Sequence, residues 1–251
     1  GAFEKVGYDL AQYEDGVVVM VYATPKSWGP NYLYFGLDIE GDLSGDTATN
    51  IVLGYSRSEM NQWAGEWTTL LQVGQEPKLF SYLHQPLGLD LSYFVQPSFS
   101  IERTNVGVFS GDDETAQYEL RQSEFQLVVG KEFGANAVFS LGVNRRSGKV
   151  RVAIGDPGLP ESDFDDGGAI ATFRYDSIDD IDFPSRGALL NLSYYQALDS
   201  MGADEAYRQW RLRSGIVTTF GNKHTLGVLT SVGGTEDGTA SFSRRFLLGG
   251  L

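Results

Sequence analysis

The sequence predicts an all-β fold, namely an antiparallel transmembrane β-barrel. Three observations favour this class: apolar and polar residues alternate with period two along many segments, turn residues recur between those segments, and no segment shows convincing helical periodicity. The composition agrees, because Gly makes up 31 of the 251 residues, and Tyr and Phe account for 13 and 15. Aromatic residues favour strands, and abundant Gly favours the turns between them.

Eleven strands are predicted in succession along most of the chain, near 31–42, 46–58, 64–74, 78–86, 92–106, 116–131, 136–154, 168–178, 187–198, 205–220 and 223–233. Their connections alternate in length: 134–136, 182–187 and 221–222 are short, whereas 106–115, 155–167 and 199–204 are longer and acidic. Short turns at one end and long polar loops at the other are typical of an up-and-down outer-membrane barrel. We interpret 155–167 as a solvated loop, since its acidic residues lack the spacing of an EF-hand calcium loop.

The clearest strands have one apolar and one polar face. The apolar faces carry Leu33, Phe35, Leu37 and Ile39, then Ala137, Phe139, Leu141 and Val143, then Ala169, Ala171, Phe173 and Tyr175, then Trp210, Leu212 and Ile216. The polar faces carry the charges Asp38, Glu40, Arg174, Asp176, Arg211 and Arg213. Because the apolar face of a membrane barrel contacts lipid, we expect these six charges to face the lumen, where they hold a loop, shape a pore or are simply solvated. For the same reason Arg is expected to be better tolerated at Gly142 than at Leu141, provided that the lumen has room there.

Composition excludes several kinds of chemistry. The 33 acidic and 19 basic residues give a net charge of −14, which disfavours a nucleic-acid partner. With no Cys and only His84 and His224, the chain offers little for a metal site or a Ser–His relay. It also lacks a Gly-x-Ser-x-Gly nucleophile elbow. We therefore expect no catalytic residue, metal or cofactor in this segment, which is predicted not to be an enzyme.

The first residues of the chain follow a different pattern. Residues 3–10 and 17–23 read as two strands around Asp15 and Gly16, and Trp28, Gly29 and Pro30 then interrupt the alternation. The sequence thus predicts the end of a small α+β domain in 1–25, followed by the barrel in 26–251.

Three stretches in this order resemble one known family. They are the segment 15–33, the strand–turn–strand stretch 174–187 with Phe183, Pro184, Arg186 and Gly187 at its turn, and Arg245 to Gly250, with Phe246, Gly249 and Gly250. Together they resemble the POTRA-and-barrel outer-membrane proteins, the bacterial surface antigen superfamily that includes BamA and the two-partner-secretion translocators. A purely structural turn also explains Pro184 and Gly187. Within the superfamily, 28–36 and 66–74 look most like the barrels of patatin-like phospholipase autotransporters of type V secretion, subtype d.

The resemblance implies an architecture. Residues 1–25 would be the C-terminal part of a POTRA domain, and 26–251 would hold about eleven strands of a barrel of about sixteen. Phe246, Gly249 and Gly250 would mark the start of the sixth extracellular loop, where this chain is truncated. In relatives that loop folds back into the lumen, so we expect 233–251 to turn inward.

The resemblance also implies a place and a function. The expected location is the bacterial outer membrane, with outer-membrane lipid, lipopolysaccharide and the barrel assembly machinery as partners. The expected function is to anchor or translocate an attached N-terminal patatin-like phospholipase domain, which would give the full-length protein its lipase activity. The alternatives are a general outer-membrane insertase or translocator and a soluble, secreted, carbohydrate-binding β protein. The sequence leaves open whether the protein forms a homo-oligomer.

Overall fold

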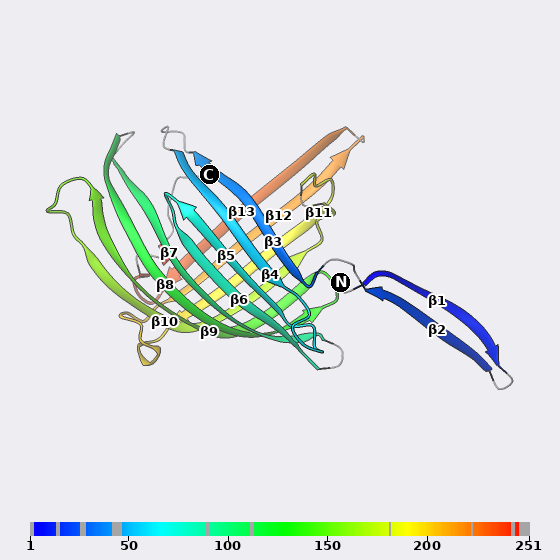
Figure 1. The fold of residues 1–251 in the computed structure, drawn as a ribbon. Helices are drawn as coiled ribbons and strands as arrows, with labels where there is room; N and C mark the ends of the chain where they lie inside the picture. The colour runs from blue at the N-terminus through cyan, green and yellow to red at the C-terminus, as the bar shows by residue number, and fades with distance from the viewer. Residues whose placement is uncertain are drawn as a thin grey trace.

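A computed structural model describes residues 3–13, 16–25, 29–41, 47–88, 91–110, 113–180, 182–221, 223–241 and 244–245. These residues form two antiparallel sheets and one short 3-10 turn, η1 (Asp199–Met201). In those ranges, no helix has the length and apolar character needed to cross a bilayer. The smaller sheet is the hairpin of β1 (Phe3–Tyr13) and β2 (Gly16–Pro25), which projects away from the larger sheet (Figure 1).

The larger sheet confirms the predicted all-β fold with its eleven strands. Each strand pairs antiparallel with its neighbours in the chain, and β3 and β13 form the two edges. The sheet curves strongly, so it has a concave inner face and a convex outer face (Figure 1). Its strands are β3 (Asn31–Gly41), β4 (Thr47–Arg57), β5 (Glu66–Gly74), β6 (Lys78–Leu87), β7 (Tyr93–Ser110), β8 (Asp113–Phe133), β9 (Ala137–Ile154), β10 (Ser162–Asp176), β11 (Gly187–Ala197), β12 (Arg208–Phe220) and β13 (His224–Glu236).

Two connections that the sequence predicts as long acidic loops are partly strand. β7 continues to Ser110 and β8 begins at Asp113, so the predicted loop 106–115 is mostly part of the ladder. β10 begins at Ser162, which shortens the predicted loop 155–167. For β10 the reason is cross-strand charge pairing: Arg151 on β9 donates to Asp163 on β10 at 2.5 Å, so an acidic run can continue as a strand. The third connection, 198–207, is a true loop that contains η1.

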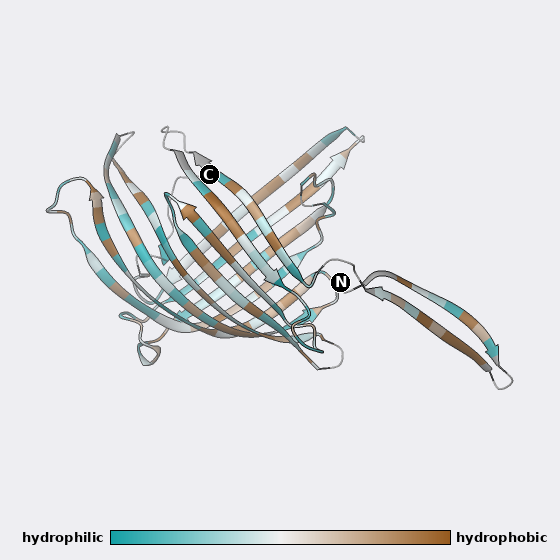
Figure 2. Ribbon diagram, in the orientation of Figure 1, coloured by the Kyte–Doolittle hydropathy of each residue, from teal (hydrophilic) through white to brown (hydrophobic). Residues whose placement is uncertain are grey.

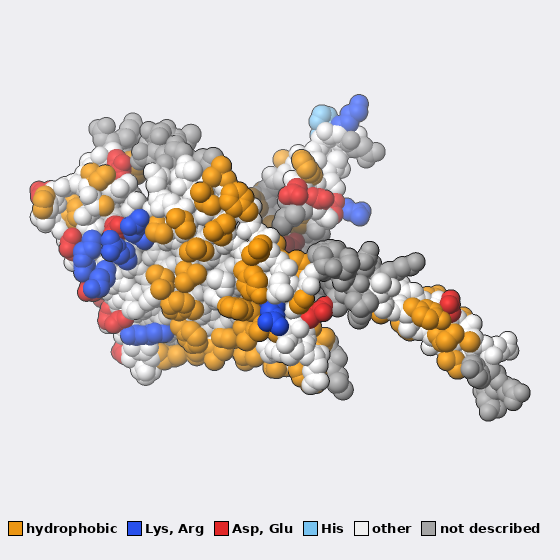
Figure 3. All heavy atoms as spheres, in the orientation of Figure 1, with side chains coloured by type: hydrophobic (Ala, Val, Ile, Leu, Met, Phe, Trp, Pro, Cys, Tyr) orange, Lys and Arg blue, Asp and Glu red, His pale blue; other side chains and the backbone are white. Residues whose placement is uncertain are grey.

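The strand register places the predicted apolar faces on one side of the sheet. Leu37 lies opposite Ile51, Leu141 lies between Val129 and Ala171, and Phe173 lies between Phe139 and Leu192. These large apolar side chains stay exposed, with 62% of Leu37 and 49% of Leu141 accessible. Brown and teal residues alternate along the strands in Figure 2, and apolar side chains gather over the face seen in Figure 3. The outer face is therefore apolar.

The inner face holds the buried polar residues. Asn50, Ser56, Thr68, Ser140, Asn144, Asp166 and Gln209 are all buried there. A soluble barrel has the opposite arrangement, with apolar side chains inside. This inversion argues against the alternative of a soluble carbohydrate-binding protein.

Gly142 corrects one expectation from the sequence. It lies on the inner face, as the alternation predicts, but a Cβ there would press on the carbonyl oxygen of Leu127 and lie 2.6 Å from Cγ1 of Val128. Arg is therefore not tolerated at Gly142. The sequence identified the face of this residue but could not show how closely β8 approaches it.

We predict that Leu141→Arg on the outer face lowers the free energy of unfolding by roughly 2–4 kcal/mol, the usual effect of a cation near the bilayer midplane. Gln126→Arg is the control, because Gln126 lines an inner cavity of about 210 Å³ together with Glu102 and Glu124. Glu102 and Glu124 already pair with Lys78 and Arg146, but the cavity is polar and away from lipid, so we expect a smaller loss than at Leu141. Denaturant unfolding in lipid vesicles measures the free energy of unfolding of both variants. Equal losses would contradict the assignment of Leu141 to the outer face and Gln126 to the inner face.

Candidate functional site

A buried carboxylate is the centre of the inner wall. Asp166 on β10 is fully buried. Its Oδ1 accepts a hydrogen bond from the Tyr195 hydroxyl at 2.6 Å, and its Oδ2 accepts bonds from the Tyr207 hydroxyl at 2.6 Å and the Ser241 hydroxyl at 3.1 Å. The Nε of Arg244 donates to the same Oδ2 at 2.9 Å. A buried charge is tolerated only when it is paired and hydrogen-bonded, and Asp166 meets both conditions.

Arg244 joins four strands through this cluster. Its Nη2 donates to Oδ1 of Asn144 on β9 at 3.0 Å, and its backbone oxygen accepts from Nε2 of Gln209 on β12 at 2.8 Å. Its guanidinium lies 3.6 Å from the ring centroid of Tyr195 on β11. This distance is typical of a cation–π contact. Arg244 therefore fixes its own backbone to the inner wall.

The residues after β13 form what we call the inward segment, residues 237–241 and 244–245. Its Ala240 is buried with Ala197, Ala203, Tyr195 and Tyr207, and Ser241 and Arg244 contact Asp166. The chain thus turns toward the inner face, as expected, but only after Glu236, because β13 extends three residues beyond the predicted end of the strand. Phe246, Gly249 and Gly250 lie outside the described residues.

Several charges predicted to face the lumen lie on the same inner face but outside the Asp166 cluster. Arg174 and Arg213 both lie opposite Asn191, and Arg211 lies opposite Ser193. Asp38 accepts a long hydrogen bond of 3.5 Å from Asn50.

The two remaining predicted charges lie at the ends of strands. Asp176 ends β10, where its side chain accepts from the backbone N–H of Ile178 at 2.9 Å. Glu40 lies in β3, and its side chain is outside the described part of the structure.

Sequence reasoning missed Asp166, Tyr195, Tyr207 and Arg244. The sequence predicts a solvated acidic loop around Asp166, although Phe164, Asp166, Gly168 and Ile170 continue the alternation of β10. That continuation is the signal that could have found it. No pattern in the sequence pairs Asp166 with Arg244, because 77 intervening residues separate them.

The loop around Tyr207 contributes to the same cluster from outside the strands. Burial, and then the hydrogen bond to Asp166, raise the pKa of the Tyr207 hydroxyl. The neutral phenol is thus favoured, and it remains a hydrogen-bond donor to Asp166 throughout the physiological range.

The turn with Phe183, Pro184, Arg186 and Gly187 connects β10 and β11. Aspartate side chains order it: Asp179 accepts from the backbone N–H groups of Ser185 at 2.9 Å and Arg186 at 3.0 Å. Gly187 has a φ of +129°, and a Cβ there would collide with the backbone of Ser177, so this position requires glycine. Phe183 and Arg186 are exposed, and Pro184 is half-buried.

Asp180 and Asp179 differ in what they bind. Asp180 accepts from the backbone N–H groups of Asp182 and Phe183, at 2.9 and 2.8 Å. The Ser185 hydroxyl, with the backbone N–H groups of Ser185 and Arg186, holds the pKa of Asp179 well below its ordinary value. The turn is also tied to β12, since the Thr219 hydroxyl donates to the Ser185 carbonyl at 2.8 Å.

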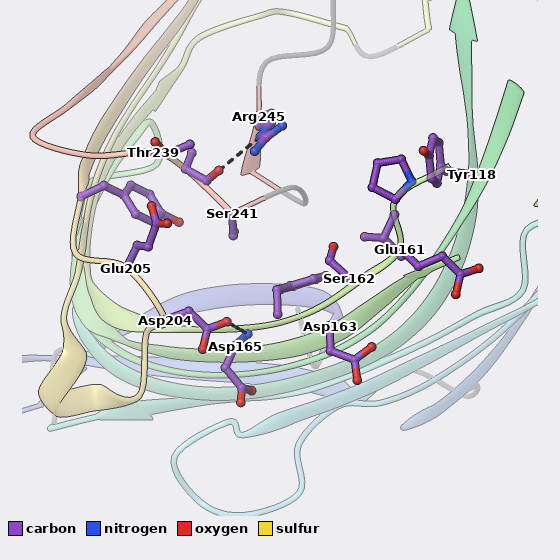
Figure 4. A pocket seen from close by; sticks show the side chains of 15 residues that line it. Tyr118, Glu161, Ser162, Asp163, Asp165, Asp204, Glu205, Thr239, Ser241 and Arg245 are labelled. Atoms are coloured by element: carbon purple, nitrogen blue, oxygen red, sulfur yellow. Dashed lines mark hydrogen bonds between the residues drawn. The ribbon is translucent and has the colours of Figure 1, made fainter. Parts of the chain in front are cut away.

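An acidic pocket of about 410 Å³ opens beside the inward segment (Figure 4). The side chains labelled around it include Glu161, Asp163, Asp165, Asp204, Glu205 and Arg245. One carboxylate oxygen of Asp204 accepts a hydrogen bond from the backbone N–H of Asp165 at 2.6 Å. Among the described residues, no group of His, Asp and Glu is arranged to hold a metal ion.

Comparison with known proteins adds the family. A model of the Omp85 superfamily domain matches residues 76–251. The chain belongs to the Omp85 superfamily. Among solved structures, the crystal structure of BamA from Haemophilus ducreyi lacking POTRA domains 1–3 has a similar fold, with a TM-score of 0.66 at 14% identity. The match covers 92% of this chain and 47% of that one, so the chain spans about half the length of that relative. No curated protein matches.

Membership of the Omp85 superfamily explains why the outer face of the sheet is apolar. The family and the BamA-like fold point to the bacterial outer membrane, so this face is the one that contacts lipid. An Omp85-type barrel is non-enzymatic, in keeping with the expectation that this segment carries no catalysis.

We predict that Asp166→Asn and Arg244→Gln each lower the free energy of unfolding by about 3–5 kcal/mol, because each leaves a buried group without its charged partner. The double variant should lose much less than the sum of the two. Arg208→Gln is the control: its ion pair with Asp237 is half exposed, so its loss should stay within about 1 kcal/mol. Strictly additive losses in denaturant unfolding would refute the coupling.

Asp179 gives a prediction on pH. Because its pKa is lowered in the folded protein, its stabilisation of the turn is complete above the ordinary carboxyl pKa of about 4 and declines as the pH falls further. Hydrogen exchange should therefore show protected amides at Ser185 and Arg186 down to about pH 4 and weaker protection below. Asp179→Ala should abolish this protection at neutral pH. Asp180→Ala should instead expose the amides of Asp182 and Phe183, and an identical pattern in both variants would contradict the assignment.

Proposed function

We propose that this Omp85 barrel anchors an N-terminal patatin-like phospholipase domain in the outer membrane and carries it to the cell surface. The observation that carries the proposal is the inverted barrel wall: an apolar outer face faces lipid, while a polar inner face binds a non-strand segment of the chain through Asp166. A wall that binds one polypeptide segment through polar groups has the chemistry to accommodate another. The similarity of 28–36 and 66–74 to patatin-linked barrels supports the choice of attached domain.

The hairpin β1–β2 supports an attached POTRA domain. Tyr8 lies opposite Val21 and Leu10 opposite Val19, so these four apolar side chains share one face of the hairpin. Each is more than half exposed. An isolated two-stranded hairpin is marginal in water, and such a face needs to be covered. We propose that 1–25 are the last two strands of a POTRA domain whose remainder covers this face.

The inward segment and the lumen-facing charges complete the proposal. We propose that the sixth loop, beginning at Phe246, Gly249 and Gly250, continues from the inward segment into the lumen. The polar wall that carries Arg174, Arg211 and Arg213 would be its surroundings. The intact barrel is then a plugged one that conducts little current.

A second function rests on the similarity to BamA. That similarity is one of fold, and it supports a general insertase that acts on other chains. The two candidates differ in substrate: the first carries a domain of its own chain, and the second acts on unrelated barrels.

The test uses the full-length protein in intact bacteria. We expect its N-terminal domain to fractionate with the outer membrane and to be digested by protease added outside the cells, while a periplasmic marker stays intact. An N-terminal domain that is protected from external protease would contradict surface display. If the purified protein then accelerates insertion of an unrelated barrel into lipid vesicles, the insertase function replaces the first.

A further inference from the structure

Charge is distributed unevenly around the inner wall. Most acidic side chains of this face come from β3 to β8, and its arginines come from β9 to β12. The first group contains Asp38, Glu66, Glu102, Glu124 and Glu132, and the second contains Arg146, Arg174, Arg211 and Arg213, joined by Arg244 of the inward segment. The exceptions are Asp166 and Asp176 on β10 and Lys78 on β6. The wall is therefore polarised, although the chain as a whole carries −14.

The basic side of the wall contains a small pocket. It has a volume of about 140 Å³ and is lined by Arg146, Ser193, Tyr195, Gln209, Arg211 and Arg244, among others. Two of its arginines already balance acids, since Arg146 pairs with Glu124 and Arg244 with Asp166. Arg211 adds a further positive charge to this pocket.

The neighbours of the pocket increase its positive charge. Arg211 lies between Ser193 and Gly233, and Arg213 lies between Asn191 and Ser231, so the residues across from both are uncharged. Arg174 lies across Asn191 from Arg213. In the described ranges, no ion pair joins Arg174 or Arg213 to a carboxylate. This part of the wall has a net positive charge.

We infer that this pocket binds the carboxylate of an acidic side chain from a polypeptide that occupies the lumen. The inference rests on the proposed function, which places a polypeptide there. Guanidinium groups match carboxylates in geometry and form strong, charge-assisted hydrogen bonds. A space of about 140 Å³ admits a single side chain but not a folded domain.

The location of the pocket selects a peptide over a lipid. It opens on the inner face, whereas the apolar face of the same strands contacts lipid, so the headgroup of a bilayer lipid does not reach it. The acidic side of the wall, from β3 to β8, repels an acidic segment and attracts a basic one. Together the two sides orient an acidic segment toward β9 to β12.

The experiment measures binding of a short labelled peptide rich in Glu to the full-length protein in detergent, by fluorescence anisotropy. A peptide of the same length with Gln in place of Glu is the reference. We expect the Glu-rich peptide to bind more tightly and to weaken with rising salt, because the attraction is electrostatic. The variant Arg211→Gln with Arg213→Gln should lose about tenfold or more in affinity, the usual effect of removing a charged hydrogen-bond partner.

Arg208→Gln is the matched control, because Arg208 lies on the same strand but on the opposite face and pairs with Asp237. It should bind the Glu-rich peptide like the unchanged protein. If the double variant does not fold, the single variant Arg213→Gln replaces it, because Arg213 is exposed and its substitution should not disturb folding. We expect this variant to lose affinity for the Glu-rich peptide, but less than the double variant.

Three results would overturn the inference: equal affinity for the Glu-rich and Gln-rich peptides, equal affinity in the Arg211 and Arg208 variants, or full displacement of the peptide by inorganic phosphate or lipopolysaccharide at equal concentration. The binding experiment does not depend on transport. If the peptide binds but the N-terminal domain stays protected in cells, the pocket stands and the proposed function fails. If the domain is displayed but the peptide does not bind, the opposite holds.

Discussion

The pairing of backbone hydrogen bonds between neighbouring strands is the constraint on which the rest of this structure depends. In hydrocarbon an unpaired N–H or C=O costs several kcal/mol, so a chain that enters the membrane as strands must form an unbroken ladder. The eleven-stranded meander from β3 to β13 is such a ladder. Once the register is set, the period of two assigns each side chain to lipid or to lumen, because a slip of one residue would exchange the faces. Leu37, Leu141 and Phe173 share the outer face for this reason.

The polar face created by the ladder has to satisfy its own buried groups, and the Asp166 cluster shows how. A carboxylate on a strand that faces away from lipid can be buried only if donors surround it. Two tyrosines supply bonds from β11 and from the loop before β12, and Ser241 and Arg244 supply bonds from the inward segment. The wall is thereby completed by residues that do not belong to it. The hydrogen bonds that Ser241 and Arg244 donate to Asp166 therefore help to fix the position of the inward segment.

The same reasoning links the two ends of the barrel wall to function. At one end, the turn between β10 and β11 is fixed by Asp179 and Asp180, which bind backbone N–H groups, while Gly187 allows the close approach to Ser177. At the other end, acidic residues pair with arginines across strands and allow β9 and β10 to extend beyond the apolar band. Between them, the arginines of β10 and β12 give the lumen a basic side. The rigid, charged interior is suited to holding an extended polypeptide, as we propose.

The sequence by itself determined the strands, their order and their facing, because these depend on local periodicity and on turn residues. All eleven predicted strands of the barrel wall are present, and the apolar faces around Leu37, Leu141, Phe173 and Leu212 are as predicted. What sequence could not determine are contacts between distant segments. The acidic composition of 155–167 predicts a loop, because arginines that pair with it lie on another strand. The sequence also predicts that Gly142 faces the lumen, but it does not show that β8 packs closely against this residue. Only the tertiary structure brings Asp166 and Arg244 together, since the curvature of the sheet, and not any spacing along the chain, places the inward segment against β10.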